Sequence, residues 1–158
     1  MNKDPMLYRP SVGVVLMNEQ GKVFVGQRID NPTEAWQMPQ GGIDKDEEPE
    51  QAALRELKEE IGCNRVEVLA GTSEWLFYDL PSDLQNKLWG GKFIGQRQLW
   101  FLARFMGSDS DINIATAKPE FSAWRWVEPQ LLPKIIVPFK RDLYNRLLEI
   151  FNYYLQKS

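Results

Sequence analysis

Residues 41–63 constrain this chain most, because they combine a glycine pair, an acidic loop and a helix whose two ends are both marked. Pro49 biases Glu48 away from helical backbone and is itself well suited to the first helical position. Gly62 is a typical residue for ending a helix. The segment therefore predicts a helix over Pro49–Ile61.

One face of this predicted helix is apolar, and the neighbouring face is acidic. At about 100° per residue, the apolar stripe comprises Ala53, Leu54, Leu57 and Ile61. The acidic arc beside it comprises Glu56, Glu59 and Glu60, whose like charges repel by roughly 0.2–0.5 kcal/mol per pair. Carboxylates clustered on a rigid helix suit Mg²⁺ or Mn²⁺. The alternative is a solvated helix face laced by Arg55 and Lys58.

The composition restricts the chemistry that such a cluster can perform. With 158 residues, 43% of them hydrophobic, residues 1–158 are expected to form one domain with a substantial core. The chain has no His and one Cys, which excludes an intrachain disulfide and a Cys-based zinc site. Catalysis is therefore expected to rest on carboxylates, Lys, Arg or Tyr.

Charge and hydropathy bear on partners and location. The net charge of −3 argues against broad nonspecific binding to nucleic acid, so DNA is not an expected partner and any RNA contact should be local. The sequence has no apolar run of transmembrane length, and its first ten residues lack the apolar stretch of a signal peptide. These features favour a cytoplasmic protein without a membrane partner.

The remaining segments predict strands, turns and a closing helix. Residues 1–7 have little to bury, which favours disorder there. Residues 12–17 and 22–28 predict a hairpin, and residues 29–35 a loop. Further strands are predicted over residues 66–78, with a break near Gly71, over residues 97–106 and over residues 121–127. Apolar residues at helical spacing predict an amphipathic helix from Pro138 onwards.

Three features leave a functional and a structural interpretation open. The loop over residues 80–95 carries several glycines with Leu88, Trp89 and Phe93, and either binds a ligand or is pinned by its own aromatic rings. Trp124 and Trp126 share one strand face, where a core position is favoured over a ligand stack.

The third feature is a pair of cations, Lys140 and Arg141, in the first turn of the closing helix. The helix dipole disfavours positive charge there by about 0.3–1 kcal/mol. A phosphate site, with Phe139 stacking on a base, would explain the pair. A solvent-exposed pair is equally compatible with this segment alone.

The spacing of Gly41, Glu47 and the run over residues 55–62 resembles the Nudix box in every fixed polar and glycine position. One departure is Cys63, where the family usually has an aliphatic residue, and a buried free Cys behaves as a small hydrophobe. The resemblance implies the family's α/β fold, an α/β/α sandwich with a mixed β-sheet. It also implies hydrolysis of a nucleoside diphosphate linked to another group, with two or more Mg²⁺ or Mn²⁺ ions held by Glu56, Glu59 and Glu60.

Further blocks extend the resemblance over nearly the whole chain: YRPSVG from Tyr8, WQMPQGG from Trp36, GQRQ from Gly95, PEF with WRWV from Pro119, and FKRD from Phe139. Together they are similar to bacterial RNA pyrophosphohydrolases and to asymmetric dinucleoside polyphosphate hydrolases. The expected reaction is removal of pyrophosphate from 5′-triphosphorylated RNA, which initiates mRNA degradation. The alternative is cleavage of a diadenosine tetraphosphate-type substrate to ATP and a nucleotide, and residues 80–95 lean towards that group.

The same resemblance implies roles for individual residues. The catalytic residues would be Glu56, Glu59, Glu60 and Glu120, and these four with Gly41 would form the metal site. The substrate-binding residues would be Arg28, Gln40, Phe139 and Lys140, and Arg55 would orient the glutamates structurally. Two rival classes are a noncatalytic nucleotide-sensing module and an interaction protein. The retention of all three box glutamates disfavours the first, and stabilisation by Mg²⁺ would exclude the second.

Overall fold

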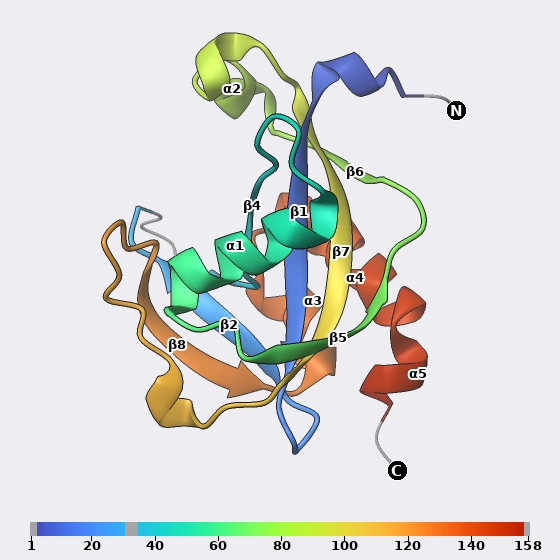
Figure 1. Ribbon diagram of the computed structural model, residues 1–158. Coiled ribbons are helices and arrows are strands. Elements are labelled where there is room, and N and C mark those ends of the chain that lie inside the picture. Colours follow the sequence, from blue (N-terminus) through green and yellow to red (C-terminus); the bar gives the residue numbers. More distant parts are fainter. Residues whose placement is uncertain (1–2, 31–34, 157–158) are drawn as a thin grey trace.

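The computed structural model describes residues 3–30 and 35–156 and shows a mixed sheet with helices on both faces (Figure 1). The strands are β1 (Tyr8–Met17), β2 (Val23–Arg28), β3 (Trp36–Gln37), β4 (Gln40–Gly42), β5 (Val66–Gly71), β6 (Leu76–Asp79), β7 (Gly95–Phe105) and β8 (Phe121–Val127). The α-helices are α1 (Pro49–Ile61), α2 (Ser82–Gln85), α3 (Leu132–Ile135), α4 (Arg141–Ile150) and α5 (Asn152–Leu155). Short 3₁₀ helices occupy Pro5–Leu7, Trp89–Gly91, Asp109–Asp111, Pro129–Leu131 and Pro138–Lys140.

The sheet is centred on β1 and β7, which run parallel from Tyr8 beside Gly95 to Met17 beside Arg104. All the other strand pairs are antiparallel, so the sheet is mixed. Helix α1 covers one face, and α3, α4 and α5 lie on the other (Figure 1). The α/β/α sandwich with a mixed β-sheet is confirmed.

Alternation along β1 separates two cores. Val12, Val14 and Leu16 pack beneath α1, whereas Val15 and Met17 point to the opposite face. This period of two follows from strand geometry, because successive side chains leave opposite sides of the sheet. Trp124 and Trp126 pack partly buried against the α1-side core, the position favoured from the sequence.

Helix α1 begins and ends where its sequence predicts. Gly62 adopts φ 73°, and its N–H donates to the Lys58 carbonyl oxygen at 2.9 Å, so the left-handed cap needs glycine. The buried arc differs from the predicted stripe, because Leu54 is only partly buried and Ala52 takes its place. The helix is rolled so that its buried side includes Glu60.

The predicted hairpin is shorter than expected, because β1 and β2 pair at Met17 and Val23 and then diverge. The space between them is filled by β3, which pairs with Gly26 and Gln27 of β2, and by β4, which pairs with residues 11–13 of β1. Tertiary pairing therefore inserts a second chain segment into the hairpin. Of the predicted loop over residues 29–35, residues 31–34 lie outside the described part.

Other segments are more ordered than the sequence predicts. The loop over residues 80–95 contains α2 and the 3₁₀ helix Trp89–Gly91, and Trp89 contacts Phe93 with ring centroids 6.1 Å apart.

The two ends of the chain also differ from the prediction. The closing helix is divided into α4 and α5 at Phe151. At the N-terminus, disorder was expected over residues 1–7. Residues 1–2 lie outside the described part, whereas Pro5–Leu7 forms a turn whose Leu7 carbonyl accepts the Ile94 N–H at 2.9 Å.

Candidate active site

The inserted strand β4 holds two glutamates of α1 against the sheet. A Cβ atom on Gly41 would collide with the Glu56 carboxylate, so the absence of a side chain there lets the carboxylate reach the backbone. The Gln40 backbone N–H donates to the carboxyl group of Glu60. The glycine pair and the acidic helix therefore form one unit.

The carboxylates at this junction disfavour one another's charge. Burial is the main cause that raises the pKa of Glu60 well above its ordinary value, followed by the charges of Glu56 and Glu120. Burial likewise raises the pKa of Glu56, where Arg55 opposes the shift. Glu59 is more exposed, but its charge still contributes to the raised pKa of Glu56. Electrostatic interactions thus link Glu56 with the other three predicted acidic residues, including Glu120, which immediately precedes β8.

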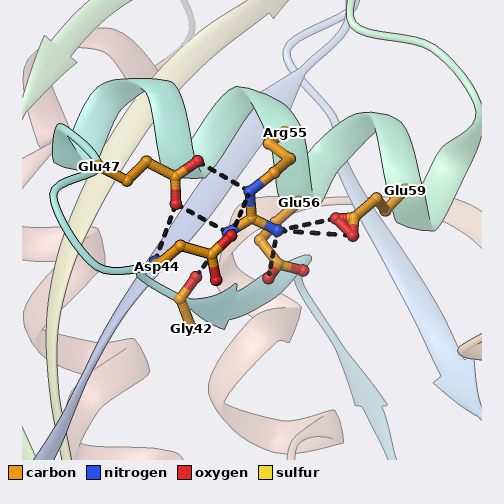
Figure 2. A network of polar contacts seen from close by, with 6 residues as sticks. All are labelled: Gly42, Asp44, Glu47, Arg55, Glu56 and Glu59. Atoms are coloured by element: carbon orange, nitrogen blue, oxygen red, sulfur yellow. Dashed lines mark hydrogen bonds and ion pairs between the residues drawn. The ribbon is translucent and has the colours of Figure 1, made fainter.

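Arg55 lies among these acids and neutralises several of them at once (Figure 2). Its Nε and Nη2 atoms donate to both carboxylate oxygens of Glu47 at 2.8 and 2.9 Å, and Nη2 also donates to the Gly42 carbonyl at 2.9 Å. Its Nη1 atom donates to Glu59 at 2.8 Å and to Glu56 at 3.2 Å. Arg55 therefore joins the acidic loop to the helix and contacts two of the predicted metal-binding glutamates.

A divalent cation suits the donors gathered here, although no three acidic side chains in the described residues lie close enough, as placed, to hold one. The donors are all oxygen atoms, which Mg²⁺ and Mn²⁺ prefer. The mutual repulsion that raises the pKa values of Glu56 and Glu60 would be relieved by a bound cation. The residues present therefore fit such an ion.

Cationic side chains face the acids from other elements. Arg28, at the end of β2, has its Nη2 atom 3.9 Å from Glu120 Oε2 and also acts electrostatically on Glu60. Lys140, which precedes α4, is buried, and its Nζ donates to Gln40 Oε1 at 3.3 Å. These three predicted substrate-binding residues, Arg28, Gln40 and Lys140, therefore adjoin the glutamates. Phe139 contacts Tyr78 with ring centroids 6.0 Å apart, and Lys140 Nζ also lies near the Tyr78 ring, 5.3 Å from its centroid.

Lys140 and Arg141, the two cations predicted as a pair, lie in different environments. Lys140 is 6% exposed, and burial lowers its pKa to about 7, with Arg28 contributing and Glu60 opposing. Arg141 is exposed, and its Nε donates to the Pro133 carbonyl at 2.8 Å, which ties α4 to α3. Lys140 is thus buried beside Gln40 and Glu60, and Arg141 has a structural partner.

A layer of buried amides supports Gln40 and escaped sequence analysis. Gln98 Nε2 donates to Gln96 Oε1 at 2.8 Å and reaches Gln40 Oε1 at 3.3 Å, while Trp100 Nε1 donates to Gln98 Oε1 at 2.8 Å. Ser11 Oγ completes the layer with a 2.6 Å bond to Gln96 Oε1. The period-two spacing of Gln96, Gln98 and Trp100 was the available signal, since all three must leave one face of a strand.

Tyr78 is a second residue that sequence analysis missed. Its side chain is 7% exposed, and Lys140 Nζ lies 5.3 Å from its ring centroid. Its pKa is raised, mainly by burial, and Gln40 hydrogen bonds to it. Tyr78 lies in the predicted strand over residues 66–78, but nothing in that strand distinguishes it from its aromatic neighbours.

Removing the Lys140 charge should stabilise the metal-free protein. Because the pKa is about 7 in the folded protein and 10.5 in the unfolded chain, the unfolded chain binds more protons between these two pH values. The cost of burying the Lys140 charge is therefore largest below about pH 7 and disappears as pH rises through about 10.5. We expect Lys140→Met to raise the free energy of unfolding by on the order of 2 kcal/mol at pH 7 and to flatten its rise between pH 7 and 10. Denaturant melts in EDTA measure this, with exposed Lys134→Met as control. A variant less stable than wild type at pH 7 would contradict it.

Glu120→Gln should lower turnover and leave substrate affinity almost unchanged. Glu120 is half exposed yet acts electrostatically on Glu56 and Glu60, so its charge serves the glutamate cluster more than substrate contact. We expect a roughly 10–100-fold fall in kcat with an unchanged KM. The matched control is Glu128→Gln, just beyond the other end of β8. Full activity in Glu120→Gln would make this residue a surface acid.

Comparison with known proteins assigns the family. The NUDIX domain model matches residues 7–147. The chain belongs to the Nudix family. An RNA pyrophosphohydrolase of Roseobacter denitrificans is 61% identical over 150 residues, covering 94% of both chains. Another, from Sphingopyxis alaskensis, is 57% identical over 153 residues, covering 96% of this chain and 97% of the relative.

Solved structures with lower sequence identity share the fold of this chain. The E. coli dihydroneopterin triphosphate pyrophosphohydrolase superposes with a TM-score of 0.68 at 20% identity, covering 91% of this chain and 99% of that one. A C. elegans Ap4A hydrolase complex gives a TM-score of 0.63 at 22% identity, covering 90% and 98%. These likenesses bear on the fold alone. Within the described residues of this Nudix chain, no helix is long and apolar enough to cross a membrane.

Proposed function

We propose that this Nudix hydrolase removes pyrophosphate from the 5′-triphosphate end of RNA, the step that initiates mRNA degradation. The observation that carries the proposal is that carboxylates from α1 and from the segment just before β8 meet cations from β2 and from the residue just before α4. Such a site can hold a polyphosphate between the cationic side chains and divalent ions that the carboxylates would bind. Relatives that are 51–61% identical over most of the chain and named RNA pyrophosphohydrolase support this substrate.

The reaction is hydrolysis of a phosphoric anhydride. Water attacks phosphorus, the bond between the α- and β-phosphates breaks, and the products are 5′-monophosphorylated RNA and pyrophosphate. Mg²⁺ or Mn²⁺, with two or more ions held by Glu56, Glu59, Glu60 and Glu120 and the Gly41 backbone, would neutralise phosphate charge and lower the pKa of water. One carboxylate of this group accepts the proton from water.

The other residues bind and orient the substrate. Lys140 and Arg28 lie beside the acidic cluster, where they would contact phosphate oxygens. Gln40 positions Lys140 through its side-chain oxygen. Phe139 and Arg28 would flank a base of the RNA, because a ring and a guanidinium group both stack on nucleobases. The cytoplasmic location expected from the sequence belongs to this proposal.

The competing substrate is a dinucleoside polyphosphate of the diadenosine tetraphosphate type. It is favoured by the aromatic segment over residues 80–95, where the Arg9 guanidinium carbon lies 5.2 Å from the Trp89 ring centroid. Arg9 also approaches Gly42 of β4, so this stack reaches the candidate site. A second base could stack on such a surface.

One experiment separates the two substrates. Triphosphorylated RNA, diadenosine tetraphosphate and free ATP are compared at equal concentration in one Mg²⁺ buffer, with products resolved by chromatography. We expect RNA to give the highest kcat/KM, with pyrophosphate as product. A higher kcat/KM for diadenosine tetraphosphate would replace RNA as the preferred substrate. No hydrolysis of any anhydride would refute the enzymatic assignment.

A further inference from the structure

A groove of about 680 Å³ adjoins the candidate site without containing any residue assigned to the reaction. Its walls come from the end of β2, from β3, from β8, and from the end of α3 with the segment that follows it. The lining residues that define its chemistry are Gln27, Trp36, Arg125, Lys134, Val137 and Pro138. Its volume falls within the ~300–1,000 Å³ of ordinary ligand clefts.

The groove is positively charged and aromatic. The Arg125 guanidinium carbon lies 4.5 Å from the Trp36 ring centroid, and Lys134 is exposed on the opposite wall. Among the described residues, the lining includes these two cations and no carboxylate, and neither cation has an acidic partner within 4.0 Å there. An aromatic ring beside unneutralised cations is the combination that binds single-stranded nucleic acid.

The chain connects this groove directly to the substrate-binding residues. Gln27 immediately precedes Arg28, and Val137 and Pro138 immediately precede Phe139 and Lys140. A polymer whose first phosphates lie between Lys140 and Arg28 must leave the site, and the groove begins at the next residue on both walls. A nucleoside triphosphate has no downstream nucleotides to enter it.

We propose that the groove binds the RNA downstream of its 5′ end, with phosphates against Arg125 and Lys134 and a base against Trp36 or the Val137 and Pro138 wall. This inference rests on the proposed RNA substrate and extends it to length selectivity. RNA long enough to enter the groove makes interactions that short RNA and dinucleoside polyphosphates lack. The groove therefore favours RNA chains among molecules with the same reactive phosphates.

The structural roles of the two cations are weaker explanations of the groove. Arg125 on Trp36 could serve only to shield the ring, and Lys134, in the last turn of α3, is favoured there by the helix dipole. Neither role requires the other residue, and neither predicts any dependence on RNA length. The experiment therefore compares substrate lengths.

The test compares three full-length proteins. They are the wild type, a groove variant that combines Arg125→Gln with Lys134→Gln, and a charge-matched control that combines Arg146→Gln with Lys22→Gln outside the groove. Each is assayed for kcat and KM with ATP, diadenosine tetraphosphate, and triphosphorylated single-stranded RNAs of two, four and eight nucleotides. We expect the groove variant to raise KM about three- to tenfold for the longer RNAs only, with kcat unchanged. The salt slope of log KM should fall by about 0.7 for each phosphate that the variant no longer neutralises. Replacing Arg125→Gln by Arg125→Lys in the groove variant should restore part of its affinity for the longer RNAs, because lysine keeps the charge.

The outcomes are distinguishable. If wild type hydrolyses RNA but the groove variant has the same KM at every length, the groove does not bind substrate and the inference is overturned. An equal loss for all substrates, ATP included, would also overturn the inference, because the cations would then act on the reactive phosphates. If wild type hydrolyses only diadenosine tetraphosphate, the proposed function itself fails and the inference fails with it.

Discussion

Glu60→Gln is expected to lower turnover by on the order of 10³-fold while making the metal-free protein more stable. Glu60 is 3% exposed, and the cost of burying its charge among Glu56 and Glu120 is what raises its pKa. Glutamine keeps the shape and can still accept the Gln40 N–H, but it has no charge to bury or to offer a cation. Stability and activity should therefore change in opposite directions.

The pH dependence gives this prediction a second signature. A carboxyl group whose pKa is raised on folding binds more protons in the folded state, so its contribution to stability is lost as pH rises from about 4.5 through the folded pKa. In EDTA, the stability advantage of Glu60→Gln should thus grow with pH, by about 1 kcal/mol or more at pH 8. Adding Mg²⁺ should raise the melting temperature of wild type more than that of the variant.

The matched control is Glu50→Gln, an exposed acid in the first turn of α1. It should leave both turnover and melting temperature close to wild type. A fully active Glu60→Gln at saturating Mg²⁺ would remove Glu60 from the metal site. An unfolded variant would show that the charge stabilises the fold, which contradicts the burial argument.

Arg55→Met is the second large expected effect, because it removes a guanidinium group that forms ion pairs with four carboxylates, the fourth being Asp44 at 3.6 Å. Methionine fills a similar volume, so the loss falls on the hydrogen bonds to Glu47, Glu56, Glu59 and the Gly42 carbonyl (Figure 2). We expect a loss of about 1–2 kcal/mol in unfolding free energy and a 10–100-fold fall in apparent Mg²⁺ affinity. Arg55→Lys should recover little, since an ammonium group cannot form the two parallel bonds to Glu47.

The Arg55 prediction is checked by melts over pH and by Mg²⁺ titration of activity. Arg55 lowers the pKa of Glu47 to about 2, so the stability from this pair is present above about pH 4.5 and is lost as pH falls towards 2. The difference in unfolding free energy between wild type and Arg55→Met should therefore become smaller as the pH is lowered. Arg65→Met, which breaks one exposed ion pair with Asp111 at 3.4 Å, is the control. Equal effects from the two variants would show that Arg55 has no special role.

Local signals in the sequence were sufficient for α1 and its acids. Pro49 and Gly62 mark the helix ends through backbone conformation, which neighbouring residues decide, and the bounds agree with the structure. The spacing of Glu56, Glu59 and Glu60 follows from helix geometry alone. The family resemblance added Glu120, Arg28 and Lys140, which no local pattern joins to the box.

The rest depended on tertiary structure. The parallel pairing of β1 with β7 joins residues about 87 positions apart, and no period within either strand specifies it. That pairing, with β4 inserted beside β1, decides which side of α1 is buried, and so Glu60 is enclosed while Leu54 is partly exposed. The sequence by itself determined the helix, its charges and the succession of strands and helices, because these follow from contacts between near neighbours. Only the tertiary structure decided the burial of Glu60 and Lys140 and the place of Tyr78, because desolvation depends on what the rest of the chain packs around a side chain.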